Sequence, residues 1–133
     1  MIDAQRVIDT ARTHLGIRFR YNGRDARGLD CVGLVKAAFA PVFDLDWPVF
    51  ARVATDEDGR QQLGRYFARV PDDQMQPADV LLYRFVRATH IGLYTGSGVI
   101  HAAVTARQVV EQRLDHPLLA GRLVGVYRLK EPI

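Results

Sequence analysis

The chain is poor in reactive side chains, because its 133 residues hold one cysteine, Cys31, and one serine, Ser97. A single cysteine cannot form an internal disulfide, so the chain is not a disulfide-stabilised scaffold and its thiol is free in the monomer. Ser97 lies in a turn-like, glycine-containing sequence, and no Gly-x-Ser-x-Gly motif occurs. A Ser-His-Asp hydrolase is therefore disfavoured.

Long hydrophobic runs are also absent. No stretch approaches the roughly 20 apolar residues that a membrane-spanning helix needs. The N-terminus does not begin with basic residues followed by an apolar run, as a secretion signal does. We therefore expect no membrane partner and no signal peptide.

Lysine is scarce, since Lys36 and Lys130 are the only lysines among 18 basic residues. The arginines that make up the rest are scattered along the chain, so no basic stripe suited to nucleic acid is visible. The net charge of +3 does not by itself single out a partner. Hydrophobic residues at 48% and charged residues at 25% are ordinary globular proportions, and residues 1–133 are expected to form one domain.

Helical patterns occupy the first half of the chain. Apolar residues recur at helical spacing in 2–15, before Gly16, and again after Asp30, a good N-cap residue, as far as Pro41. Residues 55–68 are predicted to form a third helix with Thr55 as its N-cap. The segments 17–29 and 41–77 are otherwise irregular, and Trp47 in the second of them is expected to be buried, with a place in the wall of a groove as the alternative.

Strand patterns occupy the second half of the chain. Alternating β-branched and aromatic residues predict five strands, over residues 79–85, 90–94, 99–104, 108–114 and 123–129. Helices followed by strands with short connections indicate an α+β domain, with N-terminal helices packed on a five-stranded, mainly antiparallel sheet.

Cys31 is a candidate nucleophile because of its place in the pattern. It falls in the first turn of a predicted helix, where unpaired backbone N–H groups and the helix dipole favour a thiolate. Gly28 and Gly33 flank it and would let another backbone approach the sulfur closely. A buried cysteine that only fills space is the alternative interpretation.

Two of the four histidines are candidates for a base. His90 and His101 each lie in an apolar strand among small residues, whereas His14 and His116 lie at a helix end and in a turn. If Gly96 and Ser97 form a two-residue hairpin loop, His90 and His101 share one face of the sheet as diagonal neighbours, about 7 to 8 Å apart. His101 could then orient the ring of His90.

A zinc site built from one cysteine and two histidines is a further alternative. The sequence contains no Cys-x-x-Cys, His-x-x-x-His or His-Glu-x-x-His motif, and a structural zinc ion would need a fourth ligand. We therefore expect no metal site.

Several short motifs, taken together, resemble the NlpC superfamily of papain-like cell-wall peptidases. The matching segments follow one another in order over residues 4–129: Phe19-Arg20-Tyr21-Asn22-Gly23, Leu29-Asp30-Cys31-Val32-Gly33-Leu34-Val35, Ala78-Asp79-Val80-Leu81-Leu82-Tyr83, His90-Ile91-Gly92-Leu93-Tyr94 and Ile100-His101-Ala102.

The resemblance implies a papain-like fold and a role for each matched residue. Cys31 matches the family nucleophile, His90 the base and His101 the residue that orients the base. Tyr21 matches a tyrosine associated with the oxyanion site, and Asp30 matches an aspartate associated with recognition of the free amino end of the substrate. Family members hydrolyse the bond between γ-D-glutamate and a diamino acid in peptidoglycan stem peptides, without a cofactor.

The sequence departs from the family pattern at two positions. Val32 stands where the family usually has serine after the nucleophile, and Asn22 stands where it usually has a second glycine. Val32 offers no hydroxyl, so the subsite for the amino end of the substrate is in question.

The resemblance extends to the stand-alone peptidases of phage tails and gene transfer agents. It implies a protein made in the cytoplasm and delivered to the periplasm or cell wall as part of a phage-like particle, with tail proteins as partners. Two alternatives remain open, which are an inactive tail assembly module of the same fold and a thiol acyltransferase.

Overall fold

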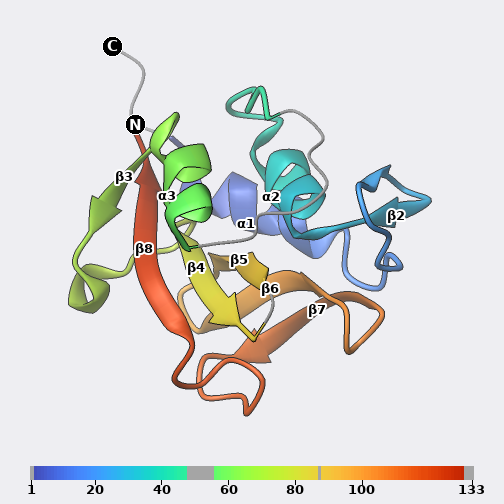
Figure 1. Cartoon of the computed structure of the whole chain (residues 1–133). Coiled ribbons are helices and arrows are strands. Elements are labelled where there is room, and N and C mark those ends of the chain that lie inside the picture. The colour runs from blue at the N-terminus through green and yellow to red at the C-terminus, as the bar shows by residue number, and fades with distance from the viewer. Residues whose placement is uncertain (1, 48–55, 87, 131–133) are drawn as a thin grey trace.

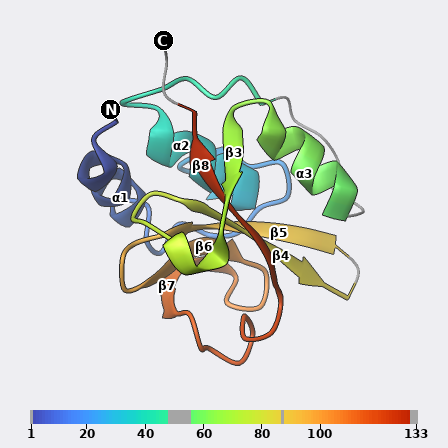
Figure 2. The same ribbon diagram turned by 90° about the vertical axis from the view of Figure 1, so that its left-hand side faces the viewer.

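The computed structural model describes residues 2–47, 56–86 and 88–130 of the chain. Three helices cover one face of a six-stranded antiparallel sheet, and a short two-stranded hairpin projects beside the helices (Figure 1). The second view shows the three helices on the same side of the sheet (Figure 2). The prediction of an α+β architecture is confirmed. No helix within the described ranges is long and apolar enough to cross a membrane.

The helices begin where capping residues allow. Helix α1 (Ala4–Arg12) follows Asp3, whose carboxylate accepts a hydrogen bond from the Arg6 N–H at 3.1 Å. Helix α2 (Cys31–Phe39) follows Asp30, whose carboxylate accepts from the Gly33 N–H at 2.8 Å, as predicted for its N-cap. Helix α3 (Asp56–Gly64) is shorter than the predicted helix 55–68, and the proposed cap at residue 55 lies outside the described residues.

The large sheet has six strands where five were predicted. The extra strand, β3 (Phe67–Val70), pairs with β8 (Leu123–Leu129) at one edge of the sheet. The sequence prediction assigned the start of β3 to the end of helix 55–68, because Leu63, Tyr66 and Phe67 are apolar at near-helical spacing. Phe67 in fact faces the core from a strand, with 1% of its surface exposed.

The other strands lie close to their predicted positions. Their order across the sheet is β3-β8-β4-β5-β6-β7, and all neighbours are antiparallel. The bounds of the four strands not yet described are as follows: β4 Val80–Phe85, β5 Ala88–Tyr94, β6 Gly98–Ala103 and β7 Gln108–Arg113. A 3₁₀ helix, Asp72–Gln74, connects β3 to β4.

The segment predicted as a loop before α2 contains a small hairpin. Strands β1 (Arg24–Asp25) and β2 (Gly28–Leu29) pair with each other and lie next to the start of α2. The carbonyl oxygen of Gly23 comes so close to Gly33 that a Cβ at Gly33 would lie 2.1 Å from it. Gly33 is therefore required for the hairpin to rest on the helix start.

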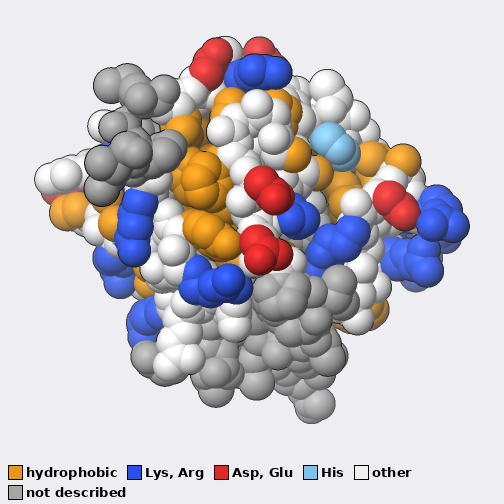
Figure 3. Space-filling view, turned by 90° about the horizontal axis from the view of Figure 1, so that it is seen from above, with side chains coloured by type: hydrophobic (Ala, Val, Ile, Leu, Met, Phe, Trp, Pro, Cys, Tyr) orange, Lys and Arg blue, Asp and Glu red, His pale blue; other side chains and the backbone are white. Residues whose placement is uncertain are grey.

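The two faces of the sheet are buried under different parts of the chain. The main core lies between the helices and one face, and includes Ile8, Leu34 and Leu93. A smaller cluster on the other face contains five buried residues: Leu81, Tyr83, Val99, Leu119 and Val126. A view from above shows hydrophobic side chains near the centre and arginine and lysine side chains dispersed around them (Figure 3). This dispersal agrees with the scattered arginines of the sequence.

The hairpin of β5 and β6 is the part of the sheet that shapes the site. Tyr94 pairs with Val99 and Leu93 with Ile100, as the predicted two-residue turn requires. The predicted pairing of Gly92 with His101 is not part of the ladder, which ends at Leu93 and Ile100. His90 and His101 lie just beyond its end.

Candidate active site

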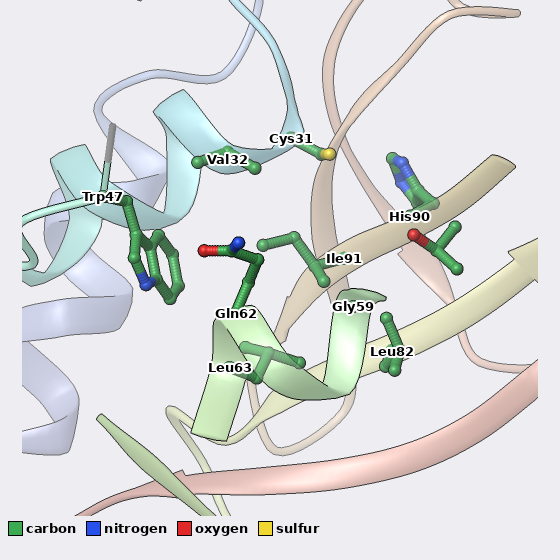
Figure 4. A pocket seen from close by; sticks show the side chains of 10 residues that line it. Cys31, Val32, Trp47, Gly59, Gln62, Leu63, Leu82, His90 and Ile91 are labelled. Atoms are coloured by element: carbon green, nitrogen blue, oxygen red, sulfur yellow. The ribbon is translucent and has the colours of Figure 1, made fainter. Parts of the chain in front are cut away.

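Cys31 is the first residue of helix α2. Its sulfur lies on the side of the helix turned toward the His90 ring (Figure 4). Cys31 is partly exposed, so a substrate can reach it. The backbone N–H groups of Ile91, Val32 and Cys31 itself are directed at the sulfur and favour the thiolate.

The resting thiol is nevertheless harder to ionise than a free cysteine. Burial is the largest effect and raises the pKa of Cys31 to about 11, with a smaller contribution from the nearby Asp30 carboxylate. The backbone N–H groups act in the opposite direction but do not outweigh burial. The helix start therefore favours the thiolate, as predicted from the sequence, but desolvation, which the sequence prediction left out, outweighs this effect in the free protein.

The two strand histidines form a direct contact. His90 Nε2 and His101 Nδ1 are 2.8 Å apart, and both residues are almost fully buried, with 8% and 2% of their surfaces exposed. The contact predicted from the hairpin is confirmed. Gly92 makes room for it, since a Cβ there would lie 2.5 Å from Val99 Cγ2 and 3.3 Å from His101 Cβ.

Gln112 on β7 extends the pair to a chain of three side chains. Its Oε1 lies 2.7 Å from His101 Nε2. Because an amide oxygen can only accept, His101 donates its Nε2 proton to Gln112. His101 Nδ1 is then an acceptor, and His90 Nε2 must carry the proton between the two rings. The Nδ1 atom of His90 is left without a proton and free to act as a base.

Sequence reasoning did not identify Gln112. It belongs to a strand whose residues alternate between buried and exposed, and a polar residue there reads as an ordinary surface position. The only signal lies in the register, because Val99 pairs with Gln112 and His101 with Val110, which puts Gln112 on the His101 face.

His90 is held as a neutral base. Its ring stacks on Phe85 with centroids 5.2 Å apart and an interplanar angle of 25°. Burial, assisted by the neighbouring His101, lowers the pKa of His90 to about 3. Burial likewise lowers the pKa of His101, partly offset by its hydrogen bond to Gln112. The resting pair is therefore a thiol and a neutral imidazole.

Asp30 carries three hydrogen bonds. Besides capping α2, its carboxylate forms an ion pair with Arg24 at 2.7 Å and accepts from the Asn22 N–H at 3.0 Å. The ion pair is largely buried, because 20% of the Arg24 side chain and 15% of the Asp30 side chain are exposed. The charge of Asp30 is thus compensated within the protein.

Tyr21 and Asn22 form the turn above the helix start. The Tyr21 ring is 63% exposed and packs edge-on against Phe19, with centroids 4.9 Å apart. Asn22 adopts a left-handed conformation with φ of 58°, which asparagine tolerates better than most residues. The departure from glycine at this position is therefore accommodated by the backbone.

A large cavity lies on one side of Cys31. It has a volume of about 480 Å³, and Tyr21, Asp30, His90 and His101 all line it. Four exposed apolar side chains form part of its wall: Tyr21, Val86, Val104 and Leu118. The cavity brings the five residues singled out in the sequence, Cys31 included, into one place.

A small apolar pocket lies on the other side of Cys31. Its volume is about 30 Å³, enough for about two water molecules. Trp47, Val32 and Ile91 line it, together with Leu63 of α3 (Figure 4). Trp47 is 5% exposed and stacks on Phe67 with centroids 5.7 Å apart, so burial, the fate expected for Trp47, is confirmed, although its ring also borders this pocket.

No group of three metal-binding side chains occurs within residues 2–47, 56–86 and 88–130. Cys31, His90 and His101 are engaged instead with backbone N–H groups, with each other and with Gln112.

Helices on one face of an antiparallel sheet, with a cysteine at a helix start facing a buried histidine pair, are typical of a papain-like fold. Comparison with known proteins gives the family. The NlpC/P60 family model matches residues 16–128, and the chain belongs to this family.

Two relatives illustrate the similarity. The chain is 27% identical over 113 residues to the Escherichia coli murein DD-endopeptidase MepS/murein LD-carboxypeptidase, covering 84% of this chain and 55% of that protein. It is 27% identical over 101 residues to a probable endopeptidase NlpC homolog of Haemophilus influenzae, covering 76% and 49%. The chain spans about half the length of these relatives.

Solved structures show the same fold. The peptidoglycan hydrolase RipB of Mycobacterium tuberculosis superposes with a TM-score of 0.73 at 25% identity, covering 97% of this chain and 65% of that one. The NlpC/p60 domain of the peptidoglycan hydrolase SagA gives a TM-score of 0.72 at 17% identity, covering 96% and 100%.

Proposed function

We propose that this protein is a cysteine peptidase that hydrolyses peptidoglycan stem peptides, at the bond between γ-D-glutamate and the diamino acid. The observation that carries the proposal is the side-chain series from Cys31 through His90 and His101 to Gln112, with contacts of 2.8 and 2.7 Å between its last three members. Such a series orients a base toward a nucleophile. Relatives named as murein endopeptidases and peptidoglycan hydrolases support the substrate class.

The first step starts from a neutral thiol. As the sulfur of Cys31 attacks the substrate carbonyl carbon, His90 Nδ1 takes the thiol proton, and the new C–S bond forms while the carbonyl π electrons move to oxygen. The His90 imidazolium that results donates from Nε2 to His101. The backbone N–H groups of Ile91 and Val32 stabilise negative charge that develops on the sulfur.

The tetrahedral oxygen needs hydrogen-bond donors of its own. The Cys31 backbone N–H and the Tyr21 hydroxyl are the proposed pair, since both border the cavity that receives the substrate. Losing one such donor typically costs about 3 kcal/mol of transition-state stabilisation.

The cycle closes in three proton transfers. The His90 imidazolium protonates the leaving amine as the C–N bond breaks, which leaves a thioester on Cys31. A water molecule then gives a proton to His90 and attacks the thioester carbonyl. The thiol leaves with that proton, and the acid product and free enzyme are regenerated.

Delivery of the protein to the periplasm or cell wall as part of a phage-like particle stays a prediction. So does the participation of phage-tail or gene-transfer-agent proteins as partners.

The test uses muropeptides that contain L-Ala-γ-D-Glu-diaminopimelate. Wild-type protein should release the diamino-acid fragment, detected by mass spectrometry, and Cys31→Ala should lower the rate by at least about 10⁴-fold, because the nucleophile is lost. A thermal melt of the variant checks that it folds. Release in water enriched in ¹⁸O should label the new carboxylate once, which separates hydrolysis from acyl transfer. Intact substrate with folded wild-type protein from about pH 5 to pH 9 would contradict the peptidase and favour the inactive assembly module.

A further inference from the structure

Charged side chains line the large cavity and can select the charge of a substrate. Among the described residues that line it, the charged side chains are Asp30 and Arg122, while His90 and His101 are held neutral. The two charged side chains differ in the hydrogen bonds and ion pairs that they already form within the protein. This difference decides which substrate charge the cavity can bind.

Asp30 has little charge left to offer. Its Oδ1 binds the Arg24 guanidinium at 2.7 Å and the Gly33 N–H at 2.8 Å, and its Oδ2 binds the Asn22 N–H at 3.0 Å. A substrate ammonium group would bind Oδ2, which already accepts from the Asn22 N–H and belongs to a carboxylate whose charge is compensated by the Arg24 guanidinium. The adjacent Val32 provides no hydroxyl to assist.

Arg122 is in the opposite situation. It is half-buried, and its guanidinium contacts the Phe85 ring at 5.6 Å from the centroid. No carboxylate of the described part of the chain pairs with it. A guanidinium with its hydrogen-bond donors free presents a flat, two-pronged site for a carboxylate.

The position of Arg122 next to the catalytic series is fixed by the backbone. Its carbonyl accepts from the Arg84 N–H at 2.9 Å, and its N–H donates to the Leu119 carbonyl at 3.1 Å. The Phe85 ring that it contacts is the same ring that stacks on His90. Arg122 thus lies one aromatic ring away from the proposed base.

We propose that this cavity selects its substrate by a free carboxylate bound to Arg122, and that it does not require a free amino group at Asp30. The inference rests on the proposed peptidase function and deepens it. In a stem peptide the carboxylate is the α-carboxyl group of the γ-linked D-glutamate, next to the bond that is cut. Because the amino end is not a recognition element, stem peptides that are still N-acylated by the glycan strand are accepted as well as free peptides.

The experiment compares three matched tripeptides based on L-Ala-γ-D-Glu-diaminopimelate: the peptide itself, its α-carboxamide at glutamate, and its N-acetyl form. For wild-type protein we expect kcat/KM to fall about 10- to 100-fold for the carboxamide, as for loss of a hydrogen bond to a charged group. We expect N-acetylation to change kcat/KM by less than about 3-fold.

Arg122→Gln should remove the preference for the carboxylate, by slowing the acid peptide and leaving the carboxamide unchanged. Arg122→Lys should restore part of it, because the charge returns without the two-pronged geometry. Arg113→Gln, which removes an exposed arginine paired with Asp115 outside the cavity, is the matched control for net charge and should leave the preference intact.

Binding to Cys31→Ala protein, measured by calorimetry with the same three peptides, separates this inference from the proposed reaction. One outcome is that wild-type protein cleaves no peptide, while Cys31→Ala protein binds the acid peptide about 10-fold more tightly than the carboxamide and Arg122→Gln abolishes this difference. In that case the proposed reaction fails and the recognition site stands. Equal binding of acid and carboxamide, or a loss of about 10-fold or more on N-acetylation, would overturn the inference whatever the outcome of the cleavage assay.

Discussion

The small pocket and the large cavity on either side of Cys31 differ in volume and in the side chains that line them. The small pocket of about 30 Å³ is bordered by Trp47, Leu63 and Ile91 and continues the hydrophobic core. The large cavity of about 480 Å³ is bordered by histidines, Asp30, Arg122 and exposed apolar side chains. The sulfur lies at the boundary between them. In the proposed reaction, the small pocket holds the Cys31 sulfur in place and the large cavity receives the substrate.

This division explains the unusual protonation of the site. The apolar side removes water from Cys31 and His90, which raises the pKa of the thiol to about 11 and lowers that of the imidazole to about 3. The polar side supplies the hydrogen bonds through His101 and Gln112 that fix which nitrogen carries the proton. In the proposed reaction, transfer of the thiol proton to His90 therefore accompanies attack, because both groups are neutral beforehand.

The largest effect should come from removing the wall of the small pocket. Trp47→Ala is expected to lower the free energy of unfolding by about 3 to 5 kcal/mol, since Trp47 is 5% exposed and stacks on Phe67. Chemical denaturation measures the change. Trp47→Phe is the control and should cost less, because it keeps a ring and removes the indole N–H, which is buried without a hydrogen-bond partner among the described residues.

Trp47→Ala also tests whether the substrate binds in the large cavity and not in the small pocket. The peptide affinity of the folded variant should change by less than about 3-fold, since Trp47 does not line the large cavity. A loss of peptide affinity with unchanged stability would mean that the small pocket binds substrate.

The second-largest effect should be a dependence of the free energy of unfolding on pH, which originates at His90 between the pocket and the cavity. The pKa of His90 is lowered from 6.5 to about 3, so between these values the unfolded chain binds a proton that the folded protein excludes. Stability contributed by neutral His90 is complete above about pH 6.5 and is lost as the pH falls toward 3, by on the order of a few kcal/mol.

Denaturation at a series of pH values, compared between wild type and His90→Asn, isolates this contribution from that of the carboxylates. The wild-type curve should fall more steeply below pH 6.5. His14→Asn is the matched control, because His14 lies at the end of α1 away from the site, and its curve should follow that of wild type. Parallel curves for wild type and His90→Asn would show that His90 is not kept neutral by burial.

The smallest effect should come from the far end of the side-chain series. Gln112→Leu removes the acceptor that sets the protonation of His101, and we expect kcat to fall about 10-fold while stability changes little, since Gln112 is partly exposed. Gln112→Glu should keep the acceptor and, by stabilising a protonated His101, shift the pH profile of kcat to higher pH. A profile that is the same in wild type, Gln112→Leu and Gln112→Glu would reduce Gln112 to a structural residue.

Much of this arrangement could be predicted from the sequence, where local patterns decide the structure. The N-cap at Asp30, the hairpin turn at Gly96 and Ser97, and the positions of five strands follow from short-range rules. The family motifs gave candidates for the site, and the contact between His90 and His101 followed from the hairpin register. The expectation of one domain over residues 1–133 stays a prediction.

What could not be predicted depends on contacts between distant segments. Strand β3 was assigned to a helix because Phe67 fits both periodicities, and only its pairing with β8 decides between them. The Arg24–Asp30 ion pair and the His101–Gln112 hydrogen bond each join a residue singled out in the sequence to a second residue, Arg24 or Gln112, that carries no signal at its own position. The raised pKa of the thiol follows from the burial of Cys31, which no local motif reveals.

Gly92 shows how strongly shape alone can constrain a position. It carries no reactive group and makes no proton transfer, yet a Cβ there would lie 2.5 Å from Val99 Cγ2 and 3.3 Å from His101 Cβ. Even alanine would push the Val99 methyl group aside and shift His101 by a few tenths of an ångström. A residue with no chemistry of its own thus helps to set the position of the second histidine, and tolerance to substitution along this hairpin measures packing as much as catalysis.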